Sequence, residues 1–289
     1  MAAHVTAIVL NWCNEEETAA CLESLAASTY TPLDVLLVDN ASPDGSGERL
    51  RARFPEVDYL ETTTNIGYAG GNNRGMERAL ADGAEYLLIL NDDTVVDREC
   101  IERLVQAMEE SSAAVTAPQI VYFDDPDRVW YGGGTFSRLR GLGKHTRLDK
   151  PRDPTQSRAT VSFVTGCCFL FRGTVFNDVG GFDESYFAYV EDAELSVRLA
   201  KHGQTMVYEP TAVVRHRIVP NAPPTPFQIR QRERNRRRLV RSHFGQFDRV
   251  RFALWFYPTR AVHAARYVLQ RDWQRARAVL EGALNPLSP

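Results

Sequence analysis

An apolar run over residues 86–90 ends abruptly in Asn91 and two adjacent acids, Asp92 and Asp93. An unbroken run of this length is typical of a buried strand in a parallel sheet. In open α/β sheets, ligands bind in the crevice outside the carboxyl ends of the strands. Two acids placed there repel each other unless a cation or a ligand donor neutralises them. A simpler interpretation is a turn that caps a helix over residues 97–111, and this segment alone does not decide between the two.

Two earlier apolar runs end in the same way. Residues 5–10 lead into Asn11, and residues 34–38 lead into Asp39. Asn14 is placed to cap the helix that follows the first run. Strands alternating with helices at this pitch predict βαβ units, and hence an α/β fold with a Rossmann-like, mostly parallel sheet flanked by helices, an architecture that commonly binds nucleotides. Strands are predicted over residues 5–10, 34–39, 57–61, 86–90, 160–171 and 206–214, and helices over residues 15–27, 45–54, 97–111 and 191–202.

A glycine-rich stretch, Asn65-Ile66-Gly67-Tyr68-Ala69-Gly70-Gly71-Asn72-Asn73, is predicted to be a turn that opens a helix ending near residue 81. Its spacing does not match the G-x-G-x-x-G dinucleotide fingerprint, and no Lys-Ser or Lys-Thr follows it as in a P-loop. Glycines allow a backbone to approach a ligand closely. A plain tight turn fits this stretch equally well.

The second half of the chain changes character after Trp130 and the three glycines that follow it closely. Residues 136–160 are polar and rich in Arg and Lys, which predicts a long loop, and long loops in compact domains are commonly functional or disordered. Gly166 interrupts the apolar run over residues 160–171, which indicates a bulge or the close approach of another group.

The last 69 residues, 221–289, are predicted to be helical and are strongly basic. They contain 14 Arg, no Lys and four acids, a net charge of +10, so residues 1–220 carry −13 in a chain whose net charge is −3. Arginines beside Trp, Phe and Tyr are typical of interfacial helices, which predicts peripheral contact with a membrane, whereas a solvated helix packed on the body is the alternative. No nucleic-acid partner is expected, because the acidic body would repel phosphates. Homodimer formation stays open.

Length and composition suit a globular protein. A chain of 289 residues makes one large domain or two small ones, and 44% hydrophobic with 25% charged residues is ordinary. Neither a membrane-spanning run of about 20 apolar residues nor a secretory signal is predicted. An odd count of five cysteines without paired spacing argues against a disulfide framework or a zinc site and suits a reducing, cytoplasmic location.

Four motifs resemble one known family when they are taken together and in order. They are Ile8-Val9-Leu10-Asn11 with Leu36-Leu37-Val38-Asp39-Asn40-Ala41-Ser42, the glycine-rich stretch, Leu90-Asn91-Asp92-Asp93, and Gly181-Phe182-Asp183-Glu184 leading to Glu191-Asp192. Over about residues 5–217 the chain resembles the family 2 glycosyltransferases, which have the GT-A fold, and within them the rhamnosyltransferase-like bacterial members. The resemblance implies a catalytic domain over 1–220, with a nucleotide-binding half (1–95) and an acceptor-binding half (96–220), before a helical basic extension (221–289).

The resemblance further implies a nucleotide diphosphate sugar as donor, with UDP or dTDP as the carrier and dTDP-rhamnose as one candidate. It places Asp39 opposite the edge of the base, where an ionised carboxylate accepts hydrogen bonds from a pyrimidine. The glycine-rich stretch would close over the nucleotide, and Trp130 with its glycines would shape the sugar and acceptor pocket. The residues expected to bind the donor are Leu10, Asn11, Asn14, Asp39, Asn40, Asn65, Gly67, Gly70, Asn72, Asn91, Asp92, Trp130 and Gly166.

The same resemblance implies which residues bind a metal ion and which residue acts as the general base. Asn91-Asp92-Asp93 falls on the D-x-D position, with Asn in place of the first Asp, so Asp93 would be the principal ligand of Mg²⁺ or Mn²⁺. His216 matches a position that supplies a further ligand in some members, although a lone His is commonly structural. Asp192 would be the general base and Glu191 would position the acceptor or substitute for it, whereas the simpler interpretation is two acids favoured in the first turn of a helix. A single displacement by the acceptor hydroxyl implies inversion at the anomeric carbon.

The chain departs from the polymerising synthases of this family, because it has neither transmembrane helices nor a Q-x-x-R-W motif. Transfer of one or a few sugars to a glycan, a glycolipid or a small natural product is therefore expected, at the inner face of the plasma membrane if the acceptor is lipid-borne. A sugar-phosphate nucleotidyltransferase is a rival interpretation, but residues 11–16 lack the glycine-rich, basic phosphate loop of those enzymes. A non-catalytic carbohydrate-binding module is the second rival interpretation.

Overall fold

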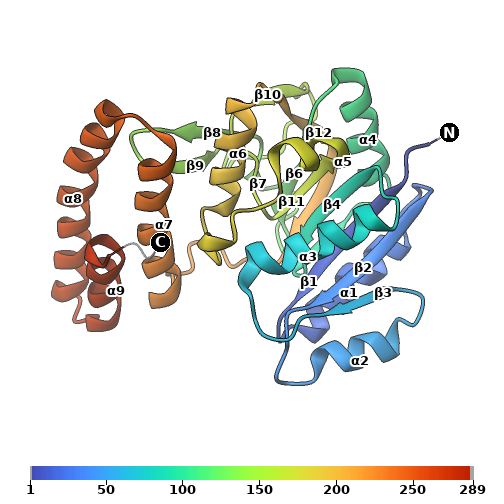
Figure 1. Cartoon of the computed structure of the whole chain (residues 1–289), viewed down its shortest axis with the longest axis horizontal. Helices are drawn as coiled ribbons and strands as arrows, with labels where there is room; N and C mark the ends of the chain where they lie inside the picture. The colour runs from blue at the N-terminus through green and yellow to red at the C-terminus, as the bar shows by residue number, and fades with distance from the viewer. Residues whose placement is uncertain (1, 287–289) are drawn as a thin grey trace.

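Residues 2–286 are described by a computed structural model, in which helices cover a ten-stranded sheet and three further helices stand to one side of it (Figure 1). The strand order is β10-β12-β6-β11-β4-β1-β2-β3, with β5 beside β12 and β7 beside β6, and β8 pairs with β9 in a separate hairpin. The strands are β1 (Val5–Asn11), β2 (Leu33–Asp39), β3 (Asp58–Glu61), β4 (Tyr86–Asn91), β5 (Thr94–Val96), β6 (Val115–Tyr122), β7 (Val129–Tyr131), β8 (Gly134–Ser137), β9 (Leu142–His145), β10 (Ala159–Val161), β11 (Cys168–Arg172) and β12 (Met206–His216).

The strands β3, β2, β1 and β4 run parallel, as the sequence predicts. Asn11 at the end of β1 lies opposite Asp39 in β2, and Leu10 lies opposite Asn91 in β4. Because parallel strands in register finish together, their polar ends meet at one edge of the sheet.

The other half of the sheet is mixed rather than mostly parallel. Strand β11 runs antiparallel to β4 and begins with Cys168 opposite Leu90. Strand β12 runs parallel to β6 but antiparallel to β5, so that His216 lies opposite Thr94. These reversals bring Gly166 and the end of β12 to the edge where β4 ends.

The helices form where apolar residues recur at helical spacing. Helix α4, for example, buries Cys100, Ile101, Leu104 and Met108 along the face that packs on the sheet. The helices of this part are α1 (Glu15–Ala26), α2 (Ser46–Arg53), α3 (Gly67–Ala81), α4 (Cys100–Ser111), α5 (Gly173–Val179) and α6 (Glu191–Lys201), with one 3₁₀ turn, η1 (Glu184–Tyr186).

Two features near the start of the chain differ from the sequence prediction. The glycine-rich stretch is not a turn before a helix, because α3 already begins at Gly67 and carries the later glycines in its first turns. Asn14 does occupy the N-cap position of α1, but its side chain donates to Glu17 at 2.9 Å instead of accepting from a backbone amide.

Two further differences lie in the second half. The expected loop over residues 136–160 contains the β8–β9 hairpin, in which Gly134 pairs with His145. The expected strand over residues 160–171 is split into β10 and β11, and Gly166 lies in the gap between them. Strand prediction failed here because the hairpin is held by contacts with distant residues: a Cβ at Gly143 would lie 2.4 Å from the ring of Phe163.

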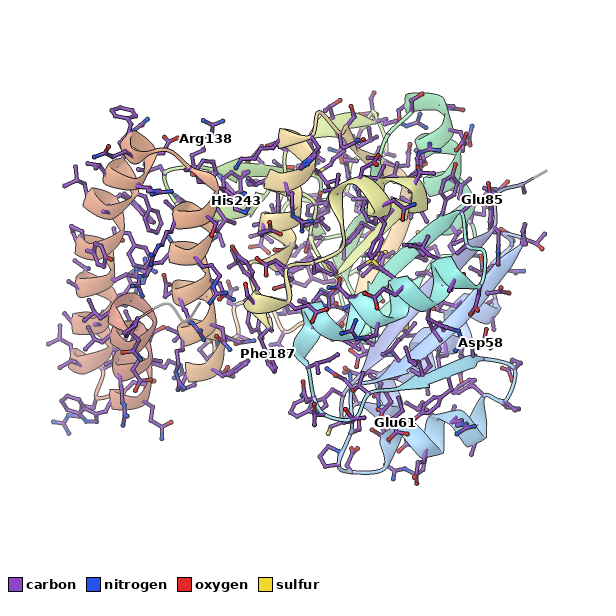
Figure 2. The ribbon with its side chains drawn as sticks, in the orientation of Figure 1. Asp58, Glu61, Glu85, Arg138, Phe187 and His243 are labelled. Atoms are coloured by element: carbon purple, nitrogen blue, oxygen red, sulfur yellow. The ribbon has the colours of Figure 1, made fainter. Side chains whose placement is uncertain are left out.

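The basic extension folds as predicted into helices, α7 (Pro226–His243), α8 (Gln246–Leu269) and α9 (Trp273–Leu284). Helix α7 lies between α6 and the outer helix α8 (Figure 1). His243, labelled in Figure 2, closes α7 and lies 3.0 Å from Glu194 of α6. No helix in residues 2–286 combines the length and the hydrophobicity that a membrane crossing requires.

The extension has an ionic core. Glu233 of α7 is 1% exposed and accepts hydrogen bonds from Arg236 at 2.6 Å and from Arg260 of α8. The rings of Trp255 and Phe256 lie beside the two guanidinium groups. Two arginines share one buried carboxylate, so this cluster ties α7 to α8.

Candidate active site

A buried hydrogen-bond network joins the ends of β1 and β2. Asn11 is fully buried and donates from Nδ2 to Asp39 Oδ1 at 2.7 Å. Ser42 donates to the same carboxylate from Oγ at 2.6 Å and from its backbone N–H at 3.1 Å. Asp39 is 3% exposed and packs against Gly47, where a Cβ would lie 2.3 Å from its carboxyl carbon. The carboxylate is therefore held by the protein itself, and contact with a base stays a prediction.

A cavity of about 820 Å³ opens beside this network. Seven of the residues expected to bind the donor line it, and they come from the ends of β1, β2 and β4 and from the start of α3: Leu10, Asn14, Asn40, Asn65, Gly67, Asn91 and Asp92. The volume is in the range of sites that bury a nucleotide-sized ligand.

Asn40 fixes the rim of this cavity. Its Nδ2 donates to Asn65 Oδ1 at 3.1 Å and to the carbonyl of Gly67 at 3.2 Å, and its Oδ1 accepts from the backbone N–H of Ile66 at 3.1 Å. Gly67 has φ +79°, and a Cβ there would lie 2.5 Å from the carbonyl oxygen of Phe187. The rim and the loop that contains Phe187 are in such close contact that only glycine fits at this position.

Six of the expected donor residues do not line the cavity: Asn11, Asp39, Gly70, Asn72, Trp130 and Gly166. Gly70 packs on Ile66 inside the first turn of α3, and Asn72 is buried and donates to the carbonyl of Tyr68 at 2.9 Å. Trp130 lies against His216, with ring centroids 4.6 Å apart. The glycines after Trp130, which were expected to shape the sugar and acceptor pocket, line a second hollow of about 430 Å³, and none of the residues expected to bind the donor lines it.

The first acid after β4, Asp92, has a shifted pKa. Burial, followed by repulsion from Asp93, raises the pKa of Asp92 to about 7. Asp93 lies opposite His216, whose Nε2 is 3.1 Å from one carboxylate oxygen and 3.2 Å from the other. The pairing of β12 with β5 causes this meeting, because it places His216 level with Thr94.

Asp93 and His216 fit a metal ion by chemistry. A carboxylate and an imidazole from different strands face each other, and His216 Nδ1 is a buried polar atom without a hydrogen-bond partner in the described residues. Carboxylate oxygens suit Mg²⁺ and Mn²⁺. Within residues 2–286, no three His, Cys, Asp or Glu side chains form a complete metal site. The protein thus offers two ligands, and a bound ion would need others from its substrate or from water.

Glu191, which is buried, and Asp192, which is partly buried, are adjacent acids at the start of α6. Asp192 accepts from the backbone N–H of Gly166 at 3.1 Å and of Ala193 at 2.7 Å. Glu191 is 7% exposed, and its Oε2 has no hydrogen-bond partner among the described residues. Burial raises the pKa of both carboxyls, and the charge of Asp192 raises that of Glu191 further, while the two amides favour the ionised form of Asp192.

The segment before β11 connects these acids with the rest of the site. The carbonyl of Cys167 accepts from the backbone N–H of Asn91 at 2.9 Å, and the next residue back, Gly166, binds Asp192. Tyr68, which lines the cavity, donates from its hydroxyl to the carbonyl of Gly166 at 2.6 Å. Thus Gly166 bridges the cavity wall, the end of β4 and the start of α6.

Several cavity residues were not foreseen: Trp12, Cys13, Tyr68, Phe187, Ala188, Tyr189 and Phe227. Tyr68 belongs to the glycine-rich stretch, and Trp12 and Cys13 directly follow Asn11. Their positions next to expected site residues could therefore have indicated them. The position of residues 187–189 just before Glu191 was also a usable signal. Phe227 carried none, because it lies in the extension.

The comparisons with known proteins agree with this architecture. Residues 7–180 match glycosyl transferase family 2. The chain is 34% identical over 217 residues to the N-acetylglucosaminyl-diphospho-decaprenol L-rhamnosyltransferase of Mycobacterium tuberculosis, covering 68% of this chain and 70% of that one. It is 30% identical over 214 residues to the galactofuranosyltransferase GlfT1 of the same organism, covering 70% of this chain and 66% of that one, just under two thirds of its length.

Solved structures show the same fold. The mannosyltransferase PcManGT from Pyrobaculum calidifontis, in complex with GDP-Man and Mn²⁺, superposes with a TM-score of 0.60 at 15% identity, covering 98% of this chain and 86% of that one. GalNAc-T7 with UDP, GalNAc and Mn²⁺ gives 0.61 at 16% identity, and the match spans 76% of this chain but only 45% of that one. The fold is therefore GT-A, and the chain belongs to glycosyltransferase family 2 and is similar to its rhamnosyltransferases.

Proposed function

We propose that this glycosyltransferase moves one sugar from a nucleotide diphosphate sugar to the hydroxyl of a lipid-linked glycan, with inversion at the anomeric carbon. The observation that carries the proposal is that the Gly166–Cys167 segment bonds to Tyr68 in the cavity wall, to Asn91 just before Asp93, and to Asp192 at the start of α6. We divide the chain into a donor half (1–95), an acceptor half (96–220) and a basic extension (221–289).

The donor would lie in the cavity between Asn40 and Asp92, with the base toward the ends of β1 and β2. Asp93 and His216 would hold Mg²⁺ or Mn²⁺. Such an ion supplies Lewis-acid stabilisation of the charge that develops on the leaving diphosphate. The pKa of Asp92, raised to about 7, makes a neighbouring cation favourable, because a positive charge relieves the repulsion between the two acids.

Asp192 would act as the general base. Two backbone amides hold its carboxylate in place and favour its charged form, so it can accept the proton of an acceptor hydroxyl. The hydroxyl oxygen then attacks the anomeric carbon from the face opposite the diphosphate, and a single displacement inverts the configuration. Glu191 would retain its proton and position the acceptor.

A lipid-linked acceptor is supported by the surface of the extension. We define the outer face of α8 by Phe247, Val250, Leu254, Tyr257 and Leu269, which recur along the exposed side of the helix. Leu254 is 73% exposed and Leu269 is 85% exposed. Helix α8 itself lies on the side of α7 that is away from the sheet (Figure 1).

The positive charge beside the outer face of α8 favours an anionic membrane as its partner. Arg251, Arg266 and Arg271 are exposed on or next to it. Two copies of a segment with net charge +10 would repel each other, whereas an anionic bilayer attracts it and also takes up the apolar side chains. We therefore propose that the outer face of α8 rests on the cytoplasmic surface of an anionic membrane. The similarity to an N-acetylglucosaminyl-diphospho-decaprenol L-rhamnosyltransferase is consistent with such an acceptor.

The donor experiment incubates the protein with a panel of UDP-, dTDP- and GDP-sugars in Mn²⁺, Mg²⁺ or EDTA and measures the melting temperature and the nucleotide released. We expect one donor to raise the melting temperature and to yield a nucleoside diphosphate only with metal. Asp93→Ala should lose this release, and Asp97→Ala, which changes a partly exposed acid outside the cavity, should keep it. Pyrophosphate would indicate a nucleotidyltransferase, and binding without any release a non-catalytic module.

A further inference from the structure

The loop between η1 and α6, residues 186–190, has an unusual backbone. Phe187, Tyr189 and Val190 have φ values of +57°, +69° and +77°. Side chains other than glycine seldom adopt this region, and they persist there only where the surroundings enforce it. Val190 directly precedes Glu191, so the conformation of the 186–190 loop sets where the catalytic acids begin.

One side chain from the extension holds this loop. Asn235 of α7 is 1% exposed, and its Nδ2 lies 2.8 Å from the carbonyl oxygen of Tyr186, 3.0 Å from that of Ala188 and 2.7 Å from that of Tyr189. An amide nitrogen carries two hydrogens, so one of them is shared between two acceptors. The carbonyl of Tyr186 also accepts from the backbone N–H of Ala188 at 2.6 Å, so the side chain of Asn235 adds to that bond and donates to the carbonyls of Ala188 and Tyr189 as well.

The loop is also held from the opposite side. The carbonyl of Phe187 accepts from the backbone N–H of Ala69 in α3 at 3.2 Å, and Gly67 leaves no room between them. Figure 2 shows Phe187 where the loop passes between the start of α3 and helix α7. The 186–190 loop is thus clamped between a helix that borders the donor cavity and a helix of the extension.

Helix α7 reaches the cavity itself as well. Phe227, in its first turn, lines the cavity together with three loop residues. Its ring centroid lies 6.3 Å from those of Phe187 and Tyr189.

From these contacts we propose that Asn235 is a positioning residue for Glu191 and Asp192, and that α7 completes the active site. The inference rests on the transfer reaction proposed above. Asn235 touches neither acid. It acts through the three carbonyls of the 186–190 loop, and removing its donors lets the loop leave its left-handed conformation and moves the start of α6.

The experiment compares Asn235→Asp with Gln231→Glu. Both change an amide to a carboxylate on α7, but only the first removes the donors from the loop, because a carboxylate only accepts. We expect hydrogen exchange of the backbone amides in residues 187–191 to rise at least about tenfold in Asn235→Asp and to stay unchanged in Gln231→Glu. Unchanged exchange in Asn235→Asp overturns the proposal.

Kinetics supply the second readout. In Asn235→Asp, kcat for transfer should fall at least about tenfold, a larger factor than any change in the KM of the donor, because the acids move with the start of α6 whereas Asn40 and Asn65 lie outside the 186–190 loop. A fall in melting temperature with kcat unchanged would mean that Asn235 is only structural, and would overturn the proposal.

Two further comparisons separate a failure of this inference from a failure of the proposed function or of folding. If the wild type transfers no sugar, the proposed function fails while hydrogen exchange still decides whether α7 holds the loop. If Asn235→Asp does not fold, Phe227→Ala replaces it, because Phe227 is 45% exposed and its loss is tolerable. That variant should also raise loop exchange and lower kcat, and wild-type values for both would overturn the role of α7.

Discussion

At the scale of single residues, the chemistry depends on how two neighbouring carboxyls ionise. Two backbone N–H groups favour the charged form of Asp192, whereas Glu191 has a buried oxygen without a partner in the described residues. The charge of Asp192 also raises the pKa of Glu191. Asp192 therefore loses its proton first as the pH rises, and Glu191 keeps its proton beside it.

A pH profile tests this order. Burial raises the pKa of Asp192, so the base is protonated and inactive at pH values well above the ordinary aspartate pKa of about 3.9. We expect kcat/KM to fall as the pH falls through this raised pKa. Glu191→Gln should leave the midpoint in place, because Glu191 is uncharged there. A midpoint near 4, or one that moves in Glu191→Gln, contradicts the assignment.

At the scale of elements, the start of α3 depends on a glycine that contacts the 186–190 loop. Gly67→Ala would bring a Cβ within 2.5 Å of Phe187, whereas Gly83→Ala, also at positive φ (+96°), has nothing within 4 Å. Both variants should lose about 1 kcal/mol of stability from backbone strain. Only Gly67→Ala should also weaken UDP binding in calorimetry. Equal binding by the two variants would contradict the close packing at the rim.

The ionic core of the extension gives a second element-scale prediction. Glu233→Gln leaves two buried guanidinium groups without their carboxylate and should cost about 3 kcal/mol of unfolding free energy. Glu281→Gln removes a carboxylate that also binds two arginines, but at the surface, and should cost less than about 1 kcal/mol. Urea unfolding measures both. Equal losses would mean that the buried cluster does not hold α7 and α8 together.

Elements could be predicted from the sequence where one buried run forms one strand. Strands β1, β2 and β4 are such runs, and their polar ends pointed to the correct edge of the sheet. The β8–β9 hairpin could not be predicted, because its glycines fit against Phe163 rather than following a local pattern. Gly166 was predicted to mark a bulge or the close approach of another group; Tyr68 and Asp192 do approach it, but the break of the run into two strands was not predicted.

The candidate site could likewise be predicted from the sequence only in part. Motif order placed Asp93 opposite His216 and put Asn40 and Asp92 on one cavity. Gly70 and Asn72 were assigned to the donor because the glycine-rich stretch was interpreted as a loop, and its helical form turns them inward. Asn235 could not be foreseen, because its acceptors lie more than 40 residues earlier in the chain.

At the scale of the whole molecule, net positive charge and exposed apolar side chains both concentrate in the extension. Binding to vesicles tests the proposed membrane contact. We expect the wild type to bind phosphatidylglycerol vesicles but not phosphatidylcholine vesicles, because the arginines need anionic headgroups. Leu254→Glu should abolish binding, and Gln274→Glu, which adds the same charge at another exposed position, should reduce it only slightly.

Two results would contradict the membrane contact. One is equal binding of wild type and Leu254→Glu to phosphatidylglycerol vesicles. The other is a stable dimer in light scattering that Leu254→Glu dissociates, since a second copy of the chain would then cover the outer face of α8.

In the proposed mechanism, the acids at the start of α6 perform the transfer beside a cavity that binds the donor independently of them. The most direct test measures Asp192→Asn with the donor found in the panel, by calorimetry for binding and by acceptor-dependent release of nucleoside diphosphate for turnover. Asp178→Asn, an exposed acid outside the cavity, is the control. We predict unchanged donor binding and a loss of turnover of at least about 100-fold in Asp192→Asn alone. Turnover by Asp192→Asn at the wild-type rate would contradict the account.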